Sequence, residues 1–282
     1  MVATAREFRS SGAVSAGPFL RAAGRAGFTA RGVVYVVIGY LALRIATDGR
    51  GPDEADREGA LRQIAARPGG TLLLWLLVLG FACMTLWRAA AAISHGRQGG
   101  HGGNGGGRRK PGKRLLDAGR AVFYASVCWG TAAFASGTGG GSNSDRASKD
   151  RTADALALPG GRLLVGAAGL ALVGVGAGIA VRAALRTFLR RLDTASMGRR
   201  TRIAVTAIGF AGNTARGTVF AGVGLFVMTA AVRFDPGRAR GVDDTLRSFA
   251  DTPAGPWLLA VVAVGLLLFG VFSFVSARRR RF

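Results

Sequence analysis

The sequence has little of the chemistry from which active sites are built. Its 282 residues include two histidines, two cysteines and 15 acidic residues, against 38 lysines and arginines. Inside the long apolar runs the only Asp, Glu or His is Asp117, near one end of its run. An enzyme needs a titratable or nucleophilic group held in a site, and proton-coupled transporters carry such groups within the membrane. We therefore expect a protein that is not an enzyme and uses no cofactor.

The scarce cysteines and histidines also argue against disulfides and metals. Cys83 and Cys128 lie in separate apolar runs, which is typical of small buried hydrophobic residues. His95 and His101 lie in a glycine-rich stretch that offers too few ligands for a metal ion, so no metal site is predicted. Although the formal net charge is +23, no basic stretch alternates with exposed aromatic residues. A nucleic-acid partner is therefore not expected.

One short motif occurs twice almost unchanged and once in altered form. It reads Gly-Phe-Thr-Ala-Arg-Gly-Val-Val-Tyr around Arg31 and Gly-Asn-Thr-Ala-Arg-Gly-Thr-Val-Phe around Arg216, and the altered copy surrounds Arg120. In every copy a glycine follows 49 residues after the arginine. A shared internal spacing indicates a repeated unit. The three glycines are Gly80, Gly169 and Gly265.

Each unit contains an apolar run, a charged connector with a short amphipathic turn, a proline–glycine segment and a second apolar run. About 20 apolar residues in a helix match the thickness of a bilayer. The sequence therefore predicts an all-α integral membrane protein with six transmembrane helices in three two-helix repeats. The predicted spans are 28–47 and 71–94 in repeat 1 (21–94), 115–136 and 163–181 in repeat 2 (115–182), and 212–232 and 256–277 in repeat 3 (203–277). Between and beyond them lie an N-terminal tail (1–20), two basic linkers (95–114 and 183–202) and a basic C-terminal tail (278–282).

Basic residues are concentrated on one side of this topology. One side comprises the two tails, the two inter-repeat linkers and the arginines at adjoining helix ends, and it holds 25 basic and three acidic residues. The connectors inside the repeats hold 13 basic and 12 acidic residues. Positively charged loops remain in the cytoplasm, so both termini are predicted to be cytoplasmic. All three repeats would then insert in the same sense, around an axis along the membrane normal.

The motif arginines, Arg31, Arg120 and Arg216, are the candidate functional residues. Around a pseudo-threefold axis they would lie at equal depth near the cytoplasmic surface. Facing inward, they would form a positive vestibule for an anion or an acidic headgroup. Facing outward, they would contact lipid phosphates and hold the helices at the interface. The second interpretation is favoured because lipid phosphates are always available.

Glycines and short amphipathic turns provide the candidate contact surfaces. Gly80, Gly169 and Gly265 are candidate helix-packing residues, as are Gly174 and Gly178, which have the Gly-x-x-x-Gly spacing that allows helices to touch closely. The amphipathic turns around Leu61–Ile64 and Leu246–Phe249 have two interpretations. They rest on the bilayer surface, or they dock an extracytoplasmic partner.

The Gly-x-x-Ala-Arg-Gly-x-Val-Tyr motif, followed by Ala-Leu, Pro-x-Gly and Leu-Leu before the second helix, resembles the bacterial family called Domain of Unknown Function 1206. The resemblance covers about residues 21 to 277 and departs in the middle copy, where Ala121 replaces the glycine. It implies an integral protein of the bacterial inner membrane, with no assigned activity. We expect a non-enzymatic scaffold or lipid-interacting protein whose partners are membrane lipids with anionic headgroups on the cytoplasmic side. The alternative is a small-solute or anion transporter or channel with an arginine vestibule.

Overall fold

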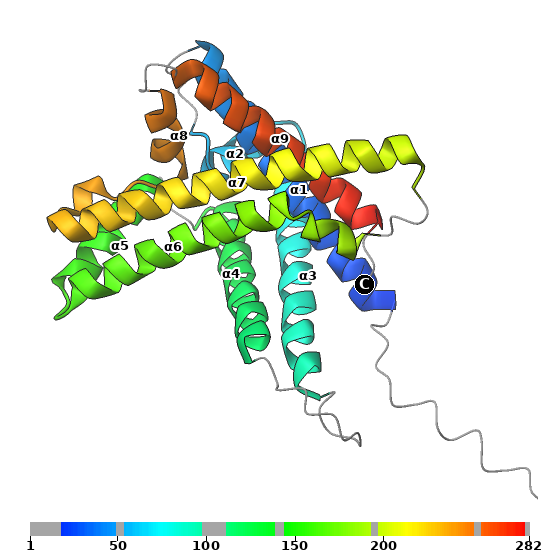
Figure 1. Ribbon diagram of the computed structural model, residues 1–282, viewed down its shortest axis with the longest axis horizontal. Helices are drawn as coiled ribbons and strands as arrows, with labels where there is room; N and C mark the ends of the chain where they lie inside the picture. Colours follow the sequence, from blue (N-terminus) through cyan, green and yellow to red (C-terminus); the bar gives the residue numbers. More distant parts are fainter. Residues whose placement is uncertain are drawn as a thin grey trace, which may run out of the picture.

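The computed structural model describes residues 18–48, 54–97, 111–138, 144–192, 197–250 and 255–279, and these residues form an all-helical structure (Figure 1). Each repeat contributes two long helices joined by a connector that contains a short one. The helices are α1 (Pro18–Asp48), α2 (Arg57–Ala65), α3 (Gly70–Arg97), α4 (Pro111–Ala135), α5 (Ser144–Ala157), α6 (Gly161–Ala184), α7 (Arg199–Arg233), α8 (Val242–Ala250) and α9 (Gly255–Arg279), with two short 3-10 helices, η1 (Thr187–Arg191) and η2 (Pro236–Arg238).

Five of the described helices, α1, α3, α6, α7 and α9, are long and apolar enough to cross a membrane. The protein is therefore a helical membrane protein. The predicted third span, α4, is not among the five, because Arg120, Tyr124 and Trp129 reduce its mean hydropathy.

Two helices begin well before the predicted spans. The sequence predicted spans from residues 28 and 212, whereas α1 begins at Pro18 and α7 at Arg199. Glycines near the predicted boundaries lie inside these helices, at positions where another part of the chain packs closely against the backbone. A Cβ atom at Gly27 would lie 2.5 Å from the Met84 Cβ, and one at Gly212 would lie 2.6 Å from the backbone of Phe269. The motif arginines are consequently in the middle of long helices.

The long helices pack as three pairs, α1 with α9, α3 with α4, and α6 with α7. In the last two pairs the second helix of one repeat packs on the first helix of the next, and the α1–α9 pair closes this series between the last repeat and the first. Within repeats, α1 contacts α3 and α7 contacts α9, whereas α4 and α6 share no extensive contact. In Figure 1 the three pairs run in different directions, with α8 and α2 toward the top and α5 at the left, and with the inter-repeat ends at the right and at the bottom.

Reciprocal glycine contacts bring the paired helices close together. A Cβ atom at Gly32 would lie 3.1 Å from the Gly270 carbonyl oxygen, and one at Gly270 would lie 2.9 Å from the Gly32 oxygen. The same reciprocal contact joins α6 and α7. A Cβ atom at Gly176 would lie 2.5 Å from the Gly217 carbonyl oxygen, and one at Gly217 would lie 2.7 Å from the Gly176 oxygen. Gly32 and Gly217 are the residues that follow the motif arginines, so the motif itself specifies these close approaches.

The predicted packing glycines divide into two groups. Cβ atoms at Gly80 and Gly265 would collide with Ala30 and Ala215, the residues that precede the motif arginines. A Cβ atom at Gly169 would collide with Met228 and the Gly224 oxygen of α7. Nothing lies within 4 Å of a Cβ atom at Gly174 or Gly178. The Gly-x-x-x-Gly pair is therefore not a helix contact within the described chain, because its face of α6 points away from α7.

The amphipathic turns form α2 and α8, which pack into the protein. Leu61, Ile64 and Leu246 are all buried in the largest hydrophobic core cluster, and Phe249 packs against that cluster. Because Leu61, Ile64 and Leu246 are buried within the chain, these three side chains are not available to rest on a bilayer or to dock a partner. Their apolar faces instead hold the connectors against the long helices.

Candidate functional site

Arg31 lies in the middle of α1 and its side chain enters the protein core. The residue is 9% exposed. Its guanidinium carbon lies 4.6 Å from the centre of the Phe28 ring and 4.9 Å from that of Phe269 in α9. Its Nε donates to the Ser273 Oγ at 3.3 Å. Stacking on aromatic rings is a common way to hold a guanidinium away from water.

Arg216 lies in the middle of α7 and approaches the same aromatic ring. Its guanidinium carbon is 5.0 Å from the centre of the Phe269 ring, 5.2 Å from Phe220 and 5.7 Å from Tyr35. The Arg216 Nε is buried and has no hydrogen-bond partner. The structure therefore brings two of the three motif arginines together around Phe269.

The second repeat contributes a tyrosine to this region. Tyr124 of α4 is 6% exposed. It lies within electrostatic reach of Arg31, Arg216 and Arg88. Arg88 of α3 is 8% exposed, and its guanidinium carbon lies 4.5 Å from the centre of the Trp87 ring. We call Arg31, Arg88, Arg216 and Tyr124 the arginine cluster.

The cluster differs from the predicted vestibule in its membership. Arg120 lies one helical turn before Tyr124 in α4 and is half-buried. Arg88, which was not predicted, is a member through its electrostatic effect on Tyr124. Arg88 could have been found as a charged residue inside the predicted span 71–94, but the repeat spacing does not include it. Arg31 points into the core, so the favoured prediction that it faces lipid phosphates is wrong.

Neither Arg31 nor Arg216 forms an ion pair with a carboxylate among the described residues. A buried charge is costly unless it is paired or hydrogen-bonded. Aromatic rings, the Ser273 hydroxyl and two tyrosines supply part of that compensation. The cluster is thus a concentrated positive region with donor groups still available, such as the Arg216 Nε.

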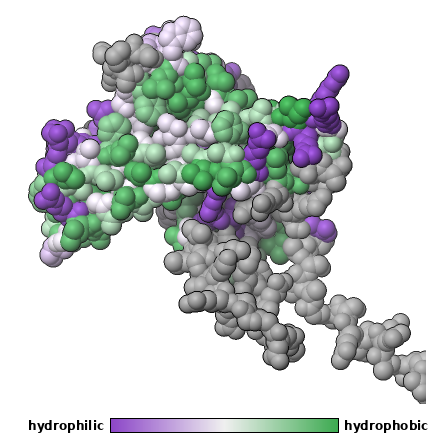
Figure 2. Space-filling model, in the orientation of Figure 1, coloured by the Kyte–Doolittle hydropathy of each residue, from purple (hydrophilic) through white to green (hydrophobic). Residues whose placement is uncertain are grey.

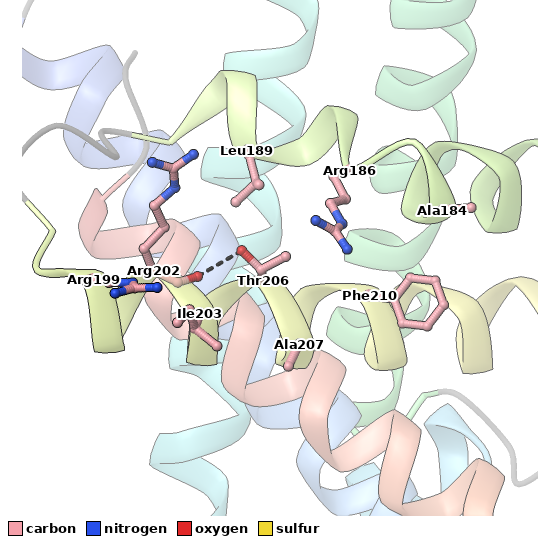
Figure 3. Close-up of a pocket in the computed structure, with 9 residues that line it drawn as sticks. All are labelled: Ala184, Arg186, Leu189, Arg199, Arg202, Ile203, Thr206, Ala207 and Phe210. Atoms are coloured by element: carbon pink, nitrogen blue, oxygen red, sulfur yellow. Dashed lines mark hydrogen bonds between the residues drawn. The ribbon is translucent and has the colours of Figure 1, made fainter.

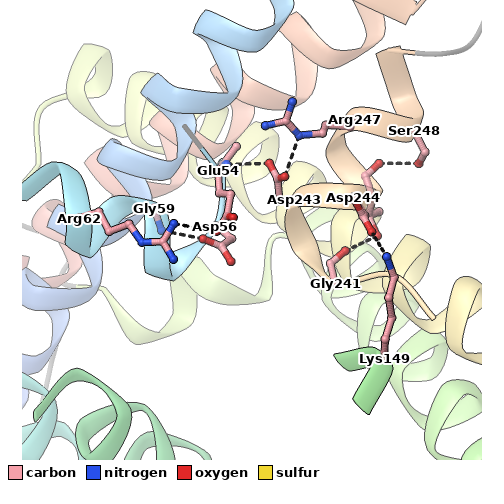
Figure 4. A network of polar contacts seen from close by, with 12 residues as sticks. Glu54, Asp56, Gly59, Arg62, Lys149, Gly241, Asp243, Asp244, Arg247 and Ser248 are labelled. Atoms are coloured by element: carbon pink, nitrogen blue, oxygen red, sulfur yellow. Dashed lines mark hydrogen bonds and ion pairs between the residues drawn. The ribbon is translucent and has the colours of Figure 1, made fainter. Parts of the chain in front are cut away.

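A second polar group, at the connector side, joins all three repeats (Figure 4). The Asp243 carboxylate of α8 accepts hydrogen bonds from the backbone N–H of Ala55 and from the Arg247 Nε, both at 2.7 Å. Asp244 forms an ion pair with Lys149 of α5 at 3.1 Å. The loops that carry Glu54 and Asp244 therefore lie on the same side of the protein, as same-sense insertion requires.

Acidic side chains are crowded at the start of α2. Burial, reinforced by the neighbouring Asp56, raises the pKa of the Glu54 carboxyl above its ordinary value. Burial also raises the pKa of Glu58, although Arg62 opposes the shift. Arg62 lies 3.5 Å from the Glu54 carboxylate and 3.8 Å from that of Glu58. These groups make a local ion-pair network around the start of α2.

The described residues contain no group of three or more His, Cys, Asp or Glu side chains that could hold a metal ion. The side chains of His95, His101 and Asp117, considered above from the sequence, lie outside the part of the chain whose side chains are described.

Comparison with known proteins gives a family without an assigned activity. No solved structure matches the chain. The chain is 30% identical over 260 residues to the "Uncharacterized protein YxxB" of Bacillus subtilis (strain 168), a match that covers 92% of this chain and 90% of that protein. The model of the family described as Domain of Unknown Function (DUF1206) matches three times, at residues 26–95, 118–186 and 211–280. With three copies of its repeat spread over most of the sequence, the chain belongs to the DUF1206 family.

Proposed function

We propose that this chain is a non-enzymatic, lipid-interacting protein of the bacterial inner membrane, with six spans and both termini in the cytoplasm. The observation that carries the proposal is the apolar outer surface of the long helices next to strongly basic ends. Figure 2 shows hydrophobic residues across the face formed by α6 and α7, with hydrophilic residues gathered toward its ends. Large apolar side chains exposed on α6 and α7 include Leu163, Leu164, Leu170, Val175, Ile203 and Leu225.

The pairing of α4 with α3 supports a sixth span. The two helices pack together and run between the same two sides of the protein. The ion pair between Lys149 and Asp244 places the connector that follows α4 beside the connector of repeat 3. If α3 crosses the membrane, α4 has to return across it to reach that connector. Arg120 and Tyr124 then lie where α3 and the core shield them from lipid.

The basic side favours acidic lipids as the partner class. Basic side chains next to a membrane attract anionic headgroups with about 1 kcal/mol per residue. The test uses the intact protein in nanodiscs that contain equal amounts of phosphatidylglycerol and phosphatidylcholine, followed by native mass spectrometry of the retained lipids. We expect preferential retention of phosphatidylglycerol. Equal retention of the two lipids would contradict the proposal.

The arginine cluster favours a second candidate function, the binding of a small anion. The specific observation is that Arg31 and Arg216 share the Phe269 ring, lack a described carboxylate partner, and leave the Arg216 Nε unsatisfied. Charged groups inside a membrane protein commonly mark an ion or substrate path. Two or three guanidiniums with a tyrosine hydroxyl are suitable donors for an oxyanion.

Sulfate titration tests this second candidate. An anion that binds the folded state stabilises it by about 2.7 kcal/mol at 100 times its dissociation constant, so the unfolding temperature of the wild-type protein should rise at constant ionic strength. Arg216→Gln should lose this rise, and Tyr124→Phe should reduce it. Arg233→Gln, an exposed position at the end of α7, controls for the general stabilising effect of sulfate. An equal response in all four proteins would exclude anion binding at the cluster.

A further inference from the structure

A groove with a basic rim lies where α6 and α7 meet on the inter-repeat side. It has a volume of about 670 Å³ and lies between the end of α6, η1 and the first turns of α7. Its floor is apolar and its polar lining is largely arginine. The lining residues are Ala184, Arg186, Leu189, Arg199, Arg202, Ile203, Thr206, Ala207 and Phe210 (Figure 3).

The local backbone makes the groove. Arg186 has a positive φ of 51°, the left-handed conformation that is uncommon for a residue other than glycine. This residue reverses the chain after α6, so that η1 lies above the start of α7 (Figure 3). The side chains of Arg186 and Arg202 reach into the intervening space from opposite sides. Such a conformation in an arginine costs free energy, and strained residues of this kind cluster at binding sites.

The chemistry of the groove matches an amphiphile with a negative headgroup. None of the lining residues is acidic, and three are arginines. Leu189, Ile203 and Phe210 provide an apolar surface, and Val181 and Leu185, near the same end of α6, are exposed. A free inorganic anion would use the arginines and leave this apolar surface unoccupied. A phospholipid uses both parts, because its phosphate pairs with guanidinium groups while its acyl chain covers the apolar floor.

We propose that this groove is a specific site for one acidic phospholipid, with the headgroup held by Arg186, Arg199 and Arg202 and an acyl chain lying along Ile203, Ala207 and Phe210. The inference rests on the proposed function and adds a location to it. It distinguishes a defined binding site from the diffuse attraction between a basic surface and an acidic membrane.

The test compares two triple variants in the same mixed-lipid nanodiscs. Arg186→Gln/Arg199→Gln/Arg202→Gln removes the groove charges. Arg21→Gln/Arg25→Gln/Arg278→Gln removes three exposed charges from the same side, outside the groove. We expect the groove variant to bind phosphatidylglycerol roughly 100-fold more weakly, at roughly fivefold per arginine, while the matched variant changes far less. An equal loss of phosphatidylglycerol affinity in the two variants would overturn the proposal that the groove is a specific site, while the proposed function of the protein would stand. If the wild-type protein shows no preference for phosphatidylglycerol, the proposed function itself fails.

A steric variant separates a lipid from a free anion. Ala207→Trp fills the apolar floor without changing the charge. We expect it to abolish the tight phosphatidylglycerol site while leaving the binding of inorganic phosphate, measured by calorimetry in detergent, unchanged. Retention of phosphatidylglycerol by Ala207→Trp would overturn the acyl-chain part of the proposal. All variants are accepted for comparison only if they elute and unfold as the wild-type protein does.

Discussion

Replacing Gly176 by alanine is expected to lower the free energy of unfolding by about 1–3 kcal/mol, because the new methyl group has no space. It would lie 2.5 Å from the Gly217 carbonyl oxygen and 2.6 Å from the Ala221 nitrogen, so two helix backbones must separate. Gly178→Ala, two residues away on the same helix, meets nothing within 4 Å. It should leave stability unchanged or raise it by up to about 1 kcal/mol, because alanine favours helix.

Unfolding in a graded mixture of mild detergent and dodecyl sulfate measures both variants against the wild-type protein. Gly217→Ala is a third member of the comparison, since its methyl group would lie 2.7 Å from the Gly176 oxygen. It should behave like Gly176→Ala. A result in which Gly178→Ala is the more destabilising of the two α6 variants would show that α6 presents a different face to α7.

Replacing Asp243 by alanine should lower the free energy of unfolding by about 2–4 kcal/mol, because it removes two charge-assisted hydrogen bonds of a nearly buried carboxylate and leaves the buried Ala55 N–H without this acceptor. The side chain is 5% exposed, and it holds the backbone of Ala55 in repeat 1 and the guanidinium of Arg247 in repeat 3. Asp243 therefore joins the connectors of the first and last repeats, next to the pair α1 and α9 that closes the fold.

Asp48→Ala is the matched control for Asp243→Ala. Asp48 forms its ion pair with Arg44 at 3.7 Å on an exposed surface, where such pairs contribute less than about 1 kcal/mol. The same detergent unfolding assay measures both. In addition, limited proteolysis should cut Asp243→Ala faster within residues 48–57 than it cuts the wild-type protein. Equal stability and equal cleavage of the two variants would show that this tether does not hold the connectors.

The repeat spacing was sufficient to find some of the packing positions. The glycine 49 residues after the motif arginine packs on the alanine that precedes the arginine in repeats 1 and 3, where the two long helices of a repeat touch each other. In repeat 2 the long helices α4 and α6 lack that contact, so Gly119 meets nothing and Gly169 packs on α7 of the next repeat. Repeat 2 differs from the other two in which helices touch each other, and the spacing of residues along the sequence does not predict such contacts.

The local sequence also does not predict which face of α6 packs against α7. Gly174 and Gly178 satisfy the four-residue spacing, but α7 lies along the face of Gly169 and Gly176, seven residues apart. Either face is rich enough in small residues to accept a helix. Only the position of the neighbouring helix decides between them, and that position depends on the linker geometry and on the reversal at Arg186.

The burial of Arg31 and Arg216 does not follow from the motif. The two arginines open the uncharged runs, yet α1 and α7 extend for more than three turns before them. The Phe269 ring of α9 lies beside both guanidiniums and helps to bury them. Because Phe269 is far from Arg31 and Arg216 in the sequence, the motif alone favoured an interfacial position.

We propose that all three repeats cross the membrane in the same sense, with the connectors on one side and the basic linkers on the other. Single cysteines at Arg67, Ala153, Gly237 and Thr201, in a background with Cys83 and Cys128 changed to serine, test this topology with a membrane-impermeant maleimide on intact cells. All four positions are exposed. We expect labelling of the first three from outside, and labelling of Thr201→Cys only after the cells are permeabilised. Labelling of Thr201→Cys in intact cells, or protection of one connector while the other two react, would contradict it.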